Sequence, residues 1–402
     1  MKYVVVIGDG MADWKIPELG YRTPLMAADI PNADFMASKG LSGKVQVVSK
    51  QIYPGSDVSN LSILGYDPEE YYTGRSPLEA ASIGVDLSPD EVAVRCNMVT
   101  LEGGLNGGEM VDYSAGHIST KEATLIIEDL NSETDGMGVL FYPGMSYRNL
   151  MVWEGGIDSV ETVPPHEIMG KEVGAYLPAG EGSRILKKIM AISEDVMKQH
   201  PVNSERIRSG KLAATSVWLW GQGKAPILPS FESAFGLKGS VIAAVDLVRG
   251  IGRYLGLRLI DVTGATGYVD TNFEGKGKAC IDQLEENDMV LVHVEAPDEA
   301  GHNGDFLTKI DSIEKIDLHI LGPLLEKIKG GDDIRVLFLP DHPTPVEIRT
   351  HSNEPVPFLI YPTPDVNDSS YINPSGYSED EADKTGYVVA KGTELMGLLT
   401  KE

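Results

Sequence analysis

The chain has 402 residues, 42% of them hydrophobic, which is enough for a sizeable core and for two structural units. Its formal net charge of −26 is expected to repel nucleic acid and anionic membranes, and any anionic ligand then requires concentrated local positive charge. No apolar run approaches the ~18 residues of a membrane span, so we expect a soluble, cytoplasmic protein. Cys96 and Cys280 are expected to be buried free thiols, as is usual in a reducing cytosol.

Residues 1–94 alternate between strand and helix patterns. Tyr3–Ile7 is continuously apolar, which is typical of a strand buried on both faces of a parallel sheet. Thr23 and Pro24 form an N-cap and first helical residue for a helix expected to end at Gly40. A capping box with proline at the first helical position predicts another helix opening at Ser76.

Residues 95–209 differ from this pattern. A hairpin is indicated at 103–108, a strand at Leu150–Trp153, and helices at about Ser119–Leu130 and Ser183–Gln199. We therefore predict a smaller α+β domain inserted into a core formed by residues 1–94 and 210–402.

Residues 210–402 contain two more continuously apolar strands, Met289–Val294 and Ile334–Leu339. Strands that alternate with helices predict an α/β fold with a doubly wound, mainly parallel sheet. The segment from Asp365 to Lys384 is expected to be a long polar loop.

An aspartate follows each of the three apolar strands, and histidines lie beside two of these aspartates. In a doubly wound sheet the carboxyl ends of the strands form the ligand crevice, so these residues are expected to converge. Taken singly, each set is most simply explained as turn chemistry or a surface pair. Together they predict a two-metal catalytic centre of mixed carboxylate and imidazole ligands that suits Mn²⁺, Zn²⁺, Co²⁺ or, less well, Mg²⁺. The expected ligands are Asp9, Asp298, His302, Asp341, His342 and His351.

Ser56 is the expected nucleophile. Pro54 and Gly55 force a tight turn before it and place it at the start of a helix running toward Leu64. The N–H groups of a helix N-terminus stabilise an alkoxide or a phosphoryl group. A plain serine N-cap is the alternative, and Ser59 is the competing nucleophile.

The ordered series Gly-Asp-Gly, Gly-Ser-Asp, Asp-x-x-x-His, Asp-His and a final His resembles the alkaline phosphatase superfamily. More narrowly, the segments 54–68, 72–80 and 295–302 resemble the archaeal-type cofactor-independent phosphoglycerate mutases. The resemblance implies an alkaline-phosphatase-type fold, a cytoplasmic isomerase of glycolysis and gluconeogenesis, and a phosphoserine intermediate. It also implies two divalent ions, Mn²⁺ first, with no need for 2,3-bisphosphoglycerate. One ion is expected on Asp298, His302 and His351, and the other on Asp9, Ser56, Asp341 and His342.

The resemblance makes the insert a cap over a small phosphorylated substrate. The expected substrate contacts are Arg75 in the core and His117, Arg148, His166 and Lys171 in the insert, with ordinary surface residues as the alternative for His166 and Lys171. Family members have an arginine-rich stretch where this chain has Asp112–Thr120 without arginine, which leaves the substrate open. A phosphotransferase acting on another small alcohol such as homoserine, a phosphatase of the same superfamily, and a non-catalytic metal-binding protein remain alternatives. The oligomeric state is left open.

Overall fold

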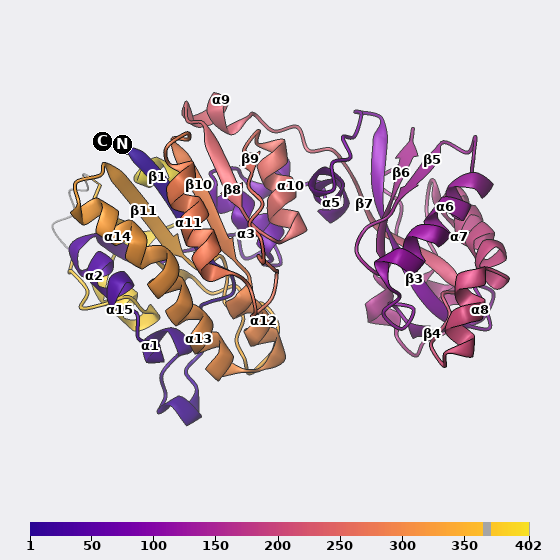
Figure 1. The fold of residues 1–402 in the computed structure, drawn as a ribbon, viewed down its shortest axis with the longest axis horizontal. Helices are drawn as coiled ribbons and strands as arrows, with labels where there is room; N and C mark the ends of the chain where they lie inside the picture. The colour runs from indigo at the N-terminus through magenta and orange to yellow at the C-terminus, as the bar shows by residue number, and fades with distance from the viewer. Residues whose placement is uncertain (365–370, 402) are drawn as a thin grey trace. The chain divides into compact units, whose positions relative to one another are not determined.

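The computed structural model describes residues 1–364 and 371–401 and divides the chain into two compact units (Figure 1). Unit 1 contains Met1–Tyr72 and Ile227–Glu402, and unit 2 is the segment Thr73–Pro226 inserted between them. The insert boundaries predicted at 95 and 209 both lie inside unit 2. The unit extends beyond them because helix α5 (Arg75–Ser82) packs on strands β3 (Glu91–Glu102) and β7 (Ser216–Lys224), which pair with each other.

Unit 1 is built on an eight-stranded sheet with the order β13-β2-β12-β11-β1-β10-β8-β9. The run from β11 to β9 is parallel, whereas β12 pairs antiparallel with both of its neighbours. The predicted α/β class with a mainly parallel sheet is therefore confirmed. The strands are β1 (Lys2–Gly8), β2 (Leu41–Val45), β8 (Gly239–Ile242), β9 (Arg258–Leu259), β10 (Met289–Val294), β11 (Ile334–Leu339), β12 (Val356–Tyr361) and β13 (Val388–Val389).

The centre of the sheet is the set of three strands predicted from their apolar runs. β1 lies between β10 and β11, with Gly8 opposite Val294 and Ile7 opposite Leu339. All three strands therefore end at the same edge of the sheet, so the loops that follow them start side by side.

Helices cover the sheet of unit 1, and α11, α13 and α14 cross the face turned to the viewer in Figure 1. Val4 and Val6 of β1 belong to one buried cluster with residues of these helices and of α2. The helices are α1 (Pro24–Ala27), α2 (Pro31–Lys39), α3 (Ser56–Ile63), α4 (Pro68–Tyr71), α9 (Phe231–Phe235), α10 (Asp246–Tyr254), α11 (Phe273–Gln283), α12 (Ala296–Asn303), α13 (Phe306–Ile316), α14 (Gly322–Lys329), α15 (Glu379–Thr385) and α16 (Leu395–Leu399).

Three local predictions in the core need correction. The helix expected from Pro24 to Gly40 is two helices, because Pro31 starts α2 and holds the residue before it out of helical conformation. The helix at Ser76 begins one residue earlier, with Gly74 as its N-cap, since the Ser76 hydroxyl donates to the Gly221 carbonyl instead. The polar loop predicted at 365–384 ends in helix α15, capped by Ser378, while residues 365–370 lie outside the described part of the chain.

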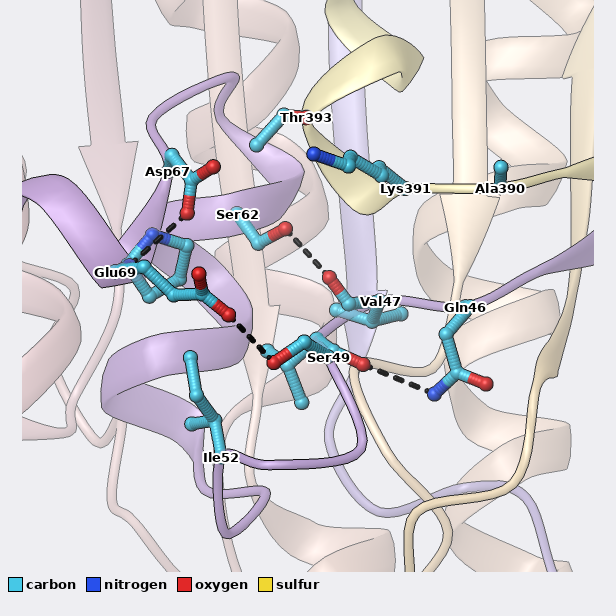
Figure 2. Close-up of a pocket in the computed structure, with 12 residues that line it drawn as sticks. Gln46, Val47, Ser49, Ile52, Ser62, Asp67, Glu69, Ala390, Lys391 and Thr393 are labelled. Carbon is cyan, nitrogen blue, oxygen red and sulfur yellow. Dashed lines mark hydrogen bonds between the residues drawn. The ribbon is translucent and has the colours of Figure 1, made fainter.

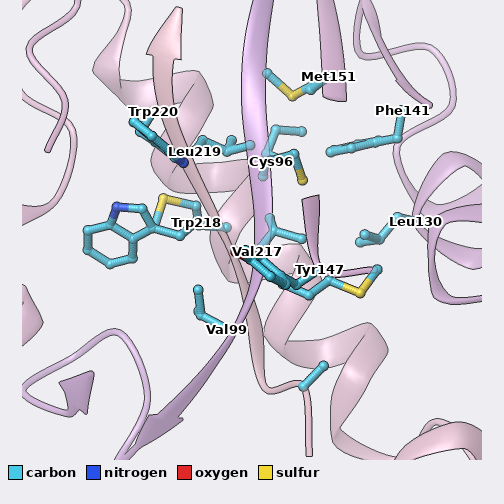
Figure 3. Close-up of a cluster of buried hydrophobic side chains, with 14 of the residues drawn as sticks. Cys96, Val99, Leu130, Phe141, Tyr147, Met151, Val217, Trp218, Leu219 and Trp220 are labelled. Atoms are coloured by element: carbon cyan, nitrogen blue, oxygen red, sulfur yellow. The ribbon is translucent and has the colours of Figure 1, made fainter. Parts of the chain in front are cut away.

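Unit 2 is an antiparallel sheet with helices packed against it. β3 pairs with β6 on one side and with β7 on the other, and its last residues pair with β4 across the predicted hairpin. Trp218 and its neighbours on β7 pack with Cys96 and Tyr147 in the hydrophobic core shown in Figure 3. The remaining elements are β4 (Glu109–Asp112), β5 (Val139–Tyr142), β6 (Arg148–Glu154), α6 (Thr120–Glu133), α7 (Ser183–Lys198) and α8 (Pro201–Arg208).

Both cysteines are buried and free, as expected. Among the described residues, none of the helices has the length and apolar character needed to cross a bilayer.

Candidate metal and phosphotransfer site

The predicted ligands do converge at the carboxyl ends of β1, β10 and β11. Two sets of potential ligand atoms form there, and within each set the atoms lie within 4.8 Å of one another. The first set comes from Asp298, His342 and His351, and the second from Asp9, His293 and Asp341. His342 lies between the two sets, since its Nε2 is 3.4 Å from Asp9 Oδ1. All of these side chains are buried except His351, which is partly buried.

Asp298 and His302 lie on one face of helix α12, as their four-residue spacing predicted. His302 Nε2 is 3.1 Å from Asp298 Oδ2 and 3.1 Å from His351 Nε2. Thr344 Oγ1 donates to Asp298 Oδ1 and holds the carboxylate from its other side.

The hydrogen bonds of His302 and His351 identify which ring nitrogen carries the proton. His302 Nδ1 lies 3.0 Å from the Arg349 carbonyl, and His351 Nδ1 lies 2.8 Å from the Pro54 carbonyl. A carbonyl oxygen only accepts, so Nδ1 carries a proton in both rings, and with a metal ion bound each ring would present the lone pair of Nε2 to it. The two Nε2 atoms face each other at 3.1 Å beside the Asp298 carboxylate, so a proton or a metal ion must lie between them. The residues therefore fit a metal ion.

Ser56 is the first residue of α3, and Gly55 is the N-cap, as the Pro-Gly turn predicted. The Ser56 hydroxyl donates to Asp9 Oδ2 at 3.0 Å. Asn60, one turn further along α3, donates to the Ser56 carbonyl at 2.8 Å and to Asp341 Oδ2 at 3.0 Å. The helix thus ties the serine to two of the carboxylates.

The electrostatics show a surplus of buried negative charge. Burial, together with the charge of Asp298, raises the pKa of Asp9 to about 7, and burial beside Asp9 raises the pKa of Asp341 well above its usual value. Burial alone would also raise the pKa of Asp298, but the hydrogen bond with His302 and the charges of His342, His302 and His351 together outweigh it and leave that pKa low. The same hydrogen bond raises the pKa of His302 to about 9. These carboxylates can all ionise together only when cations neutralise them.

Sequence reasoning missed several polar groups of this site. His293 is fully buried at the end of β10, and it is the one polar residue in the run Met289–Val294. Glu295 follows it, and Lys276 of α11 donates to the His293 carbonyl at 2.7 Å. For His293, the available sequence signal was a histidine inside an apolar strand. For Asn60, it was the spacing of one helical turn from Ser56.

The candidate substrate contacts of unit 2 fall into two places. His117 and Arg148 both contact the ring of Tyr147, and His166 contacts the rings of Tyr113 and Trp220. Since Tyr113 and Tyr147 are also in contact, these three candidates belong to one aromatic cluster.

Arg95, which was not among the substrate contacts expected from the sequence, stacks on Trp220 at 4.1 Å and lies within electrostatic reach of Arg75 and Arg148. Unit 2 therefore gathers three arginines near these rings. Lys171 instead donates to the Glu167 carbonyl and lies over the ring of Tyr176.

Asp112–Thr120, the segment without arginine, forms a tight left-handed turn. Ala115, Gly116 and His117 have φ values of +49°, +60° and +48°. Asp112 accepts hydrogen bonds from Ser114 and Gly116, and the buried Arg206 of α8 donates to the Ala115 and Gly116 carbonyls. An arginine from another helix thus fixes the backbone that carries His117.

A separate pocket of about 200 Å³ lies at the other end of α3 (Figure 2). Ser62 of α3 lines it and donates to the Val47 carbonyl, and Ser49 donates to Glu69 across its wall. None of the predicted site residues lines this pocket.

Comparison with known proteins identifies the family. The protein of Methanosarcina acetivorans named 2,3-bisphosphoglycerate-independent phosphoglycerate mutase is 47% identical over 100% of both chains. The chain belongs to this family. Residues 37–203 also match the family described as 2,3-bisphosphoglycerate-independent phosphoglycerate mutase.

Two solved structures agree with this assignment. One, of a Pyrococcus horikoshii protein, has a TM-score of 0.82 at 28% identity and covers 99% of this chain and 96% of that one. The other is the cofactor-independent phosphoglycerate mutase of Thermoplasma acidophilum, with a TM-score of 0.68 at 26% identity and 99% coverage of both chains. The resemblance drawn from the sequence segments is confirmed.

Proposed function

We propose that the chain is a phosphoglycerate mutase that interconverts 3-phosphoglycerate and 2-phosphoglycerate without 2,3-bisphosphoglycerate, through a phosphoserine on Ser56. Family membership supports the reaction, and one observation supports the mechanism. Ser56, at a helix N-terminus, donates to Asp9 beside a set of buried carboxylates and histidine lone pairs.

The proposed cofactors are two divalent cations, with Mn²⁺ as the first choice. One is assigned to the group around Asp298 and His351, with His302, and the other to Asp9 and Asp341, with Ser56 and His342 as further ligands. When bound, the cations neutralise the carboxylates and stabilise negative charge on the serine and phosphoryl oxygens.

The residues of the chain then carry the transfer. The hydrogen bond to Asp9 Oδ2 aims the Ser56 oxygen and holds its proton where the carboxylate can take it. As the bond from Ser56 Oγ to phosphorus forms, the bond from phosphorus to the substrate's O3 breaks, and O3 receives the proton. Glycerate then reorients. The bond from its O2 to phosphorus forms as the bond from phosphorus to Ser56 Oγ breaks, and the proton released by O2 passes through Asp9 to Ser56 Oγ, which regenerates the serine.

Substrate binding is assigned to unit 2. Arg148, His117 and His166, which share one aromatic cluster, are proposed to bind the carboxylate or phosphoryl group, with Arg75 as a further cation. Arginine matches both groups through its planar fork. Lys171 is the weakest of the proposed contacts because its ammonium is engaged elsewhere.

The test is conversion of 3-phosphoglycerate by the purified, Mn²⁺-supplemented chain, coupled to enolase, without 2,3-bisphosphoglycerate or ATP. We expect turnover that EDTA abolishes. Release of inorganic phosphate in place of 2-phosphoglycerate would instead establish a phosphatase. Turnover only with ATP and a small alcohol such as homoserine would establish a phosphotransferase.

A further inference from the structure

His293 and Glu295 lie in the centre of the site, yet neither has a role in the two ligand sets assigned above. His293 is fully buried at the end of β10, and both of its ring nitrogens lack a hydrogen-bond partner among the described residues. A buried imidazole without partners is costly, because it has given up its hydrogen bonds to water. We therefore expect at least one ring nitrogen of His293 to bind a partner, either a hydrogen-bonding group or a metal ion.

The two sides of the ring face different groups. His293 Nε2 lies 3.1 Å from Asp9 Oδ2. Potential ligand atoms, one each from His293, Asp9 and Asp341, lie within 4.8 Å of one another. On the other side, Nδ1 faces Glu295 Oε2 at 3.9 Å. This Glu295 oxygen is buried and also lacks a hydrogen-bond partner among the described residues.

Glu295 lies near enough to Nδ1 to orient the ring when an ion is bound. A metal-bound histidine usually directs its other N–H toward a carboxylate, which fixes the tautomer. With the proton on Nδ1, toward Glu295, the Nε2 lone pair points at the carboxylates of Asp9 and Asp341. Lys276 holds the strand end by donating to the His293 carbonyl at 2.7 Å.

From this geometry we infer that His293 is a metal ligand: its Nε2 completes the set around the Asp9 and Asp341 ion, and Glu295 positions the ring from behind. The inference rests on the proposed two-cation function. His342, whose Nε2 lies 3.4 Å from Asp9 Oδ1, remains a further ligand of the same ion, as proposed above. Each ion is thereby held by carboxylate and imidazole together.

A substitution by cysteine gives a direct readout. Metal-free H293C, loaded with Co²⁺ under reducing conditions, is expected to show a thiolate-to-cobalt charge-transfer absorption that Co²⁺-loaded wild-type protein lacks. V294C is the matched control, because successive residues of a strand point to opposite faces. A band in H293C alone supports the inference. Wild-type Co²⁺ stoichiometry without that band overturns it.

H293Q and E295Q provide the second measurement, a Mn²⁺ titration by calorimetry with metal content from elemental analysis. We expect H293Q to lower the affinity for one of the two Mn²⁺ ions at least about tenfold. E295Q should lower the affinity for the same ion by no more than about 10- to 100-fold. Unchanged affinity in H293Q overturns the inference and leaves the proposed function standing. Absence of Mn²⁺ binding by the wild-type chain overturns both.

Discussion

Ser56 Oγ lies 3.0 Å from Asp9 Oδ2 and donates its hydrogen bond to that oxygen, although Asp9 follows β1 and Ser56 begins α3. This bond separates Ser56 from Ser59, its competitor on the same helix. Ser59 is also buried, but its hydroxyl has no hydrogen-bond partner among the described residues. Only Ser56 is coupled to the carboxylates.

Ser56→Ala is therefore expected to reduce mutase turnover by at least about 10³-fold, because the group that accepts the phosphoryl is gone. Mn²⁺ binding at the Asp298 group and the unfolding midpoint should stay close to those of the wild type. Ser59→Ala is the control and should retain turnover within a few-fold. Near-normal turnover of the Ser56 variant would falsify the nucleophile assignment.

Asn60→Ala tests the link between α3 and the carboxylates. The amide donates to Asp341 Oδ2 and to the Ser56 carbonyl, so its loss frees the carboxylate of a proposed metal ligand and loosens the serine. We expect Mn²⁺ affinity to fall by about 10- to 100-fold, as for other groups that orient ligands. Ser62→Ala, at the far end of the same helix beside the pocket in Figure 2, is the control and should bind Mn²⁺ normally. Equal affinities in both variants would remove Asn60 from the site.

Much of this site was predictable because its backbone is set by short local signals. β1, β10 and β11 are continuously apolar, and a parallel arrangement of such strands brings the residues that follow them to one edge. Ser56 was found because Pro54 and Gly55 impose the turn before α3. The break at Pro31 was also readable from the sequence, since proline starts helices better than it continues them.

The residues that were missed depend on tertiary contacts. A histidine within an apolar strand, such as His293, has the same sequence pattern as a satisfied core histidine, and only the fold shows that Asp9 faces it. Asp13 and Lys309 form a buried ion pair although they are 296 residues apart. Arg206 donates hydrogen bonds to the carbonyls of a turn that lies about 90 residues earlier in the chain. Local spacing carries no information about such partners.

The His302 and Asp298 pair predicts how the stability of the metal-free protein depends on pH. The pKa of His302 is raised to about 9 in the folded state, from 6.5 when unfolded. A raised pKa stabilises the fold fully below 6.5, and this contribution is lost as pH rises through about 9. In EDTA, the stability difference between wild type and His302→Ala should therefore shrink between pH 6.5 and 9. Urea unfolding at several pH values measures it, and a difference that grows with pH contradicts the pairing.

Lys309 ties together two of the loops that carry the site. Its ammonium is fully buried and donates to Asp13 Oδ2 at 2.6 Å, to the Ala12 carbonyl at 3.2 Å and to the Thr344 carbonyl at 2.9 Å. Lys309→Met leaves Asp13 buried without its counter-ion, so we expect a loss of about 3–5 kcal/mol in unfolding free energy.

Adding Asp13→Asn should recover part of that loss, since the uncompensated charge is removed. Lys315→Met breaks an exposed pair with Asp311 on the same helix and should cost no more than about 1 kcal/mol. Denaturant unfolding of the wild type and the three variants measures both effects. A double variant less stable than Lys309→Met alone would show that burial of the Asp13 charge is not the cause.

Arg206 supports the left-handed turn that carries His117, and this support can be tested separately from the metal site. Its guanidinium is 1% exposed and donates to the Ala115 and Gly116 carbonyls and to Glu122 Oε2. Lysine keeps the charge but loses the planar fork. Loss of one charged hydrogen bond, about 1.5 kcal/mol, corresponds to roughly a tenfold change in a binding constant.

Because the proposed role of His117 is to bind substrate, Arg206→Lys should raise the KM for 3-phosphoglycerate about tenfold, with kcat and Mn²⁺ affinity nearly unchanged. Arg208→Lys, on the exposed side of the same helix, is the matched control and should leave KM unaltered. His117→Ala should reproduce the effect of Arg206→Lys on KM, and combining the two should add little, since both act through one side chain. Fully additive effects would mean that Arg206 acts on the substrate through something other than His117.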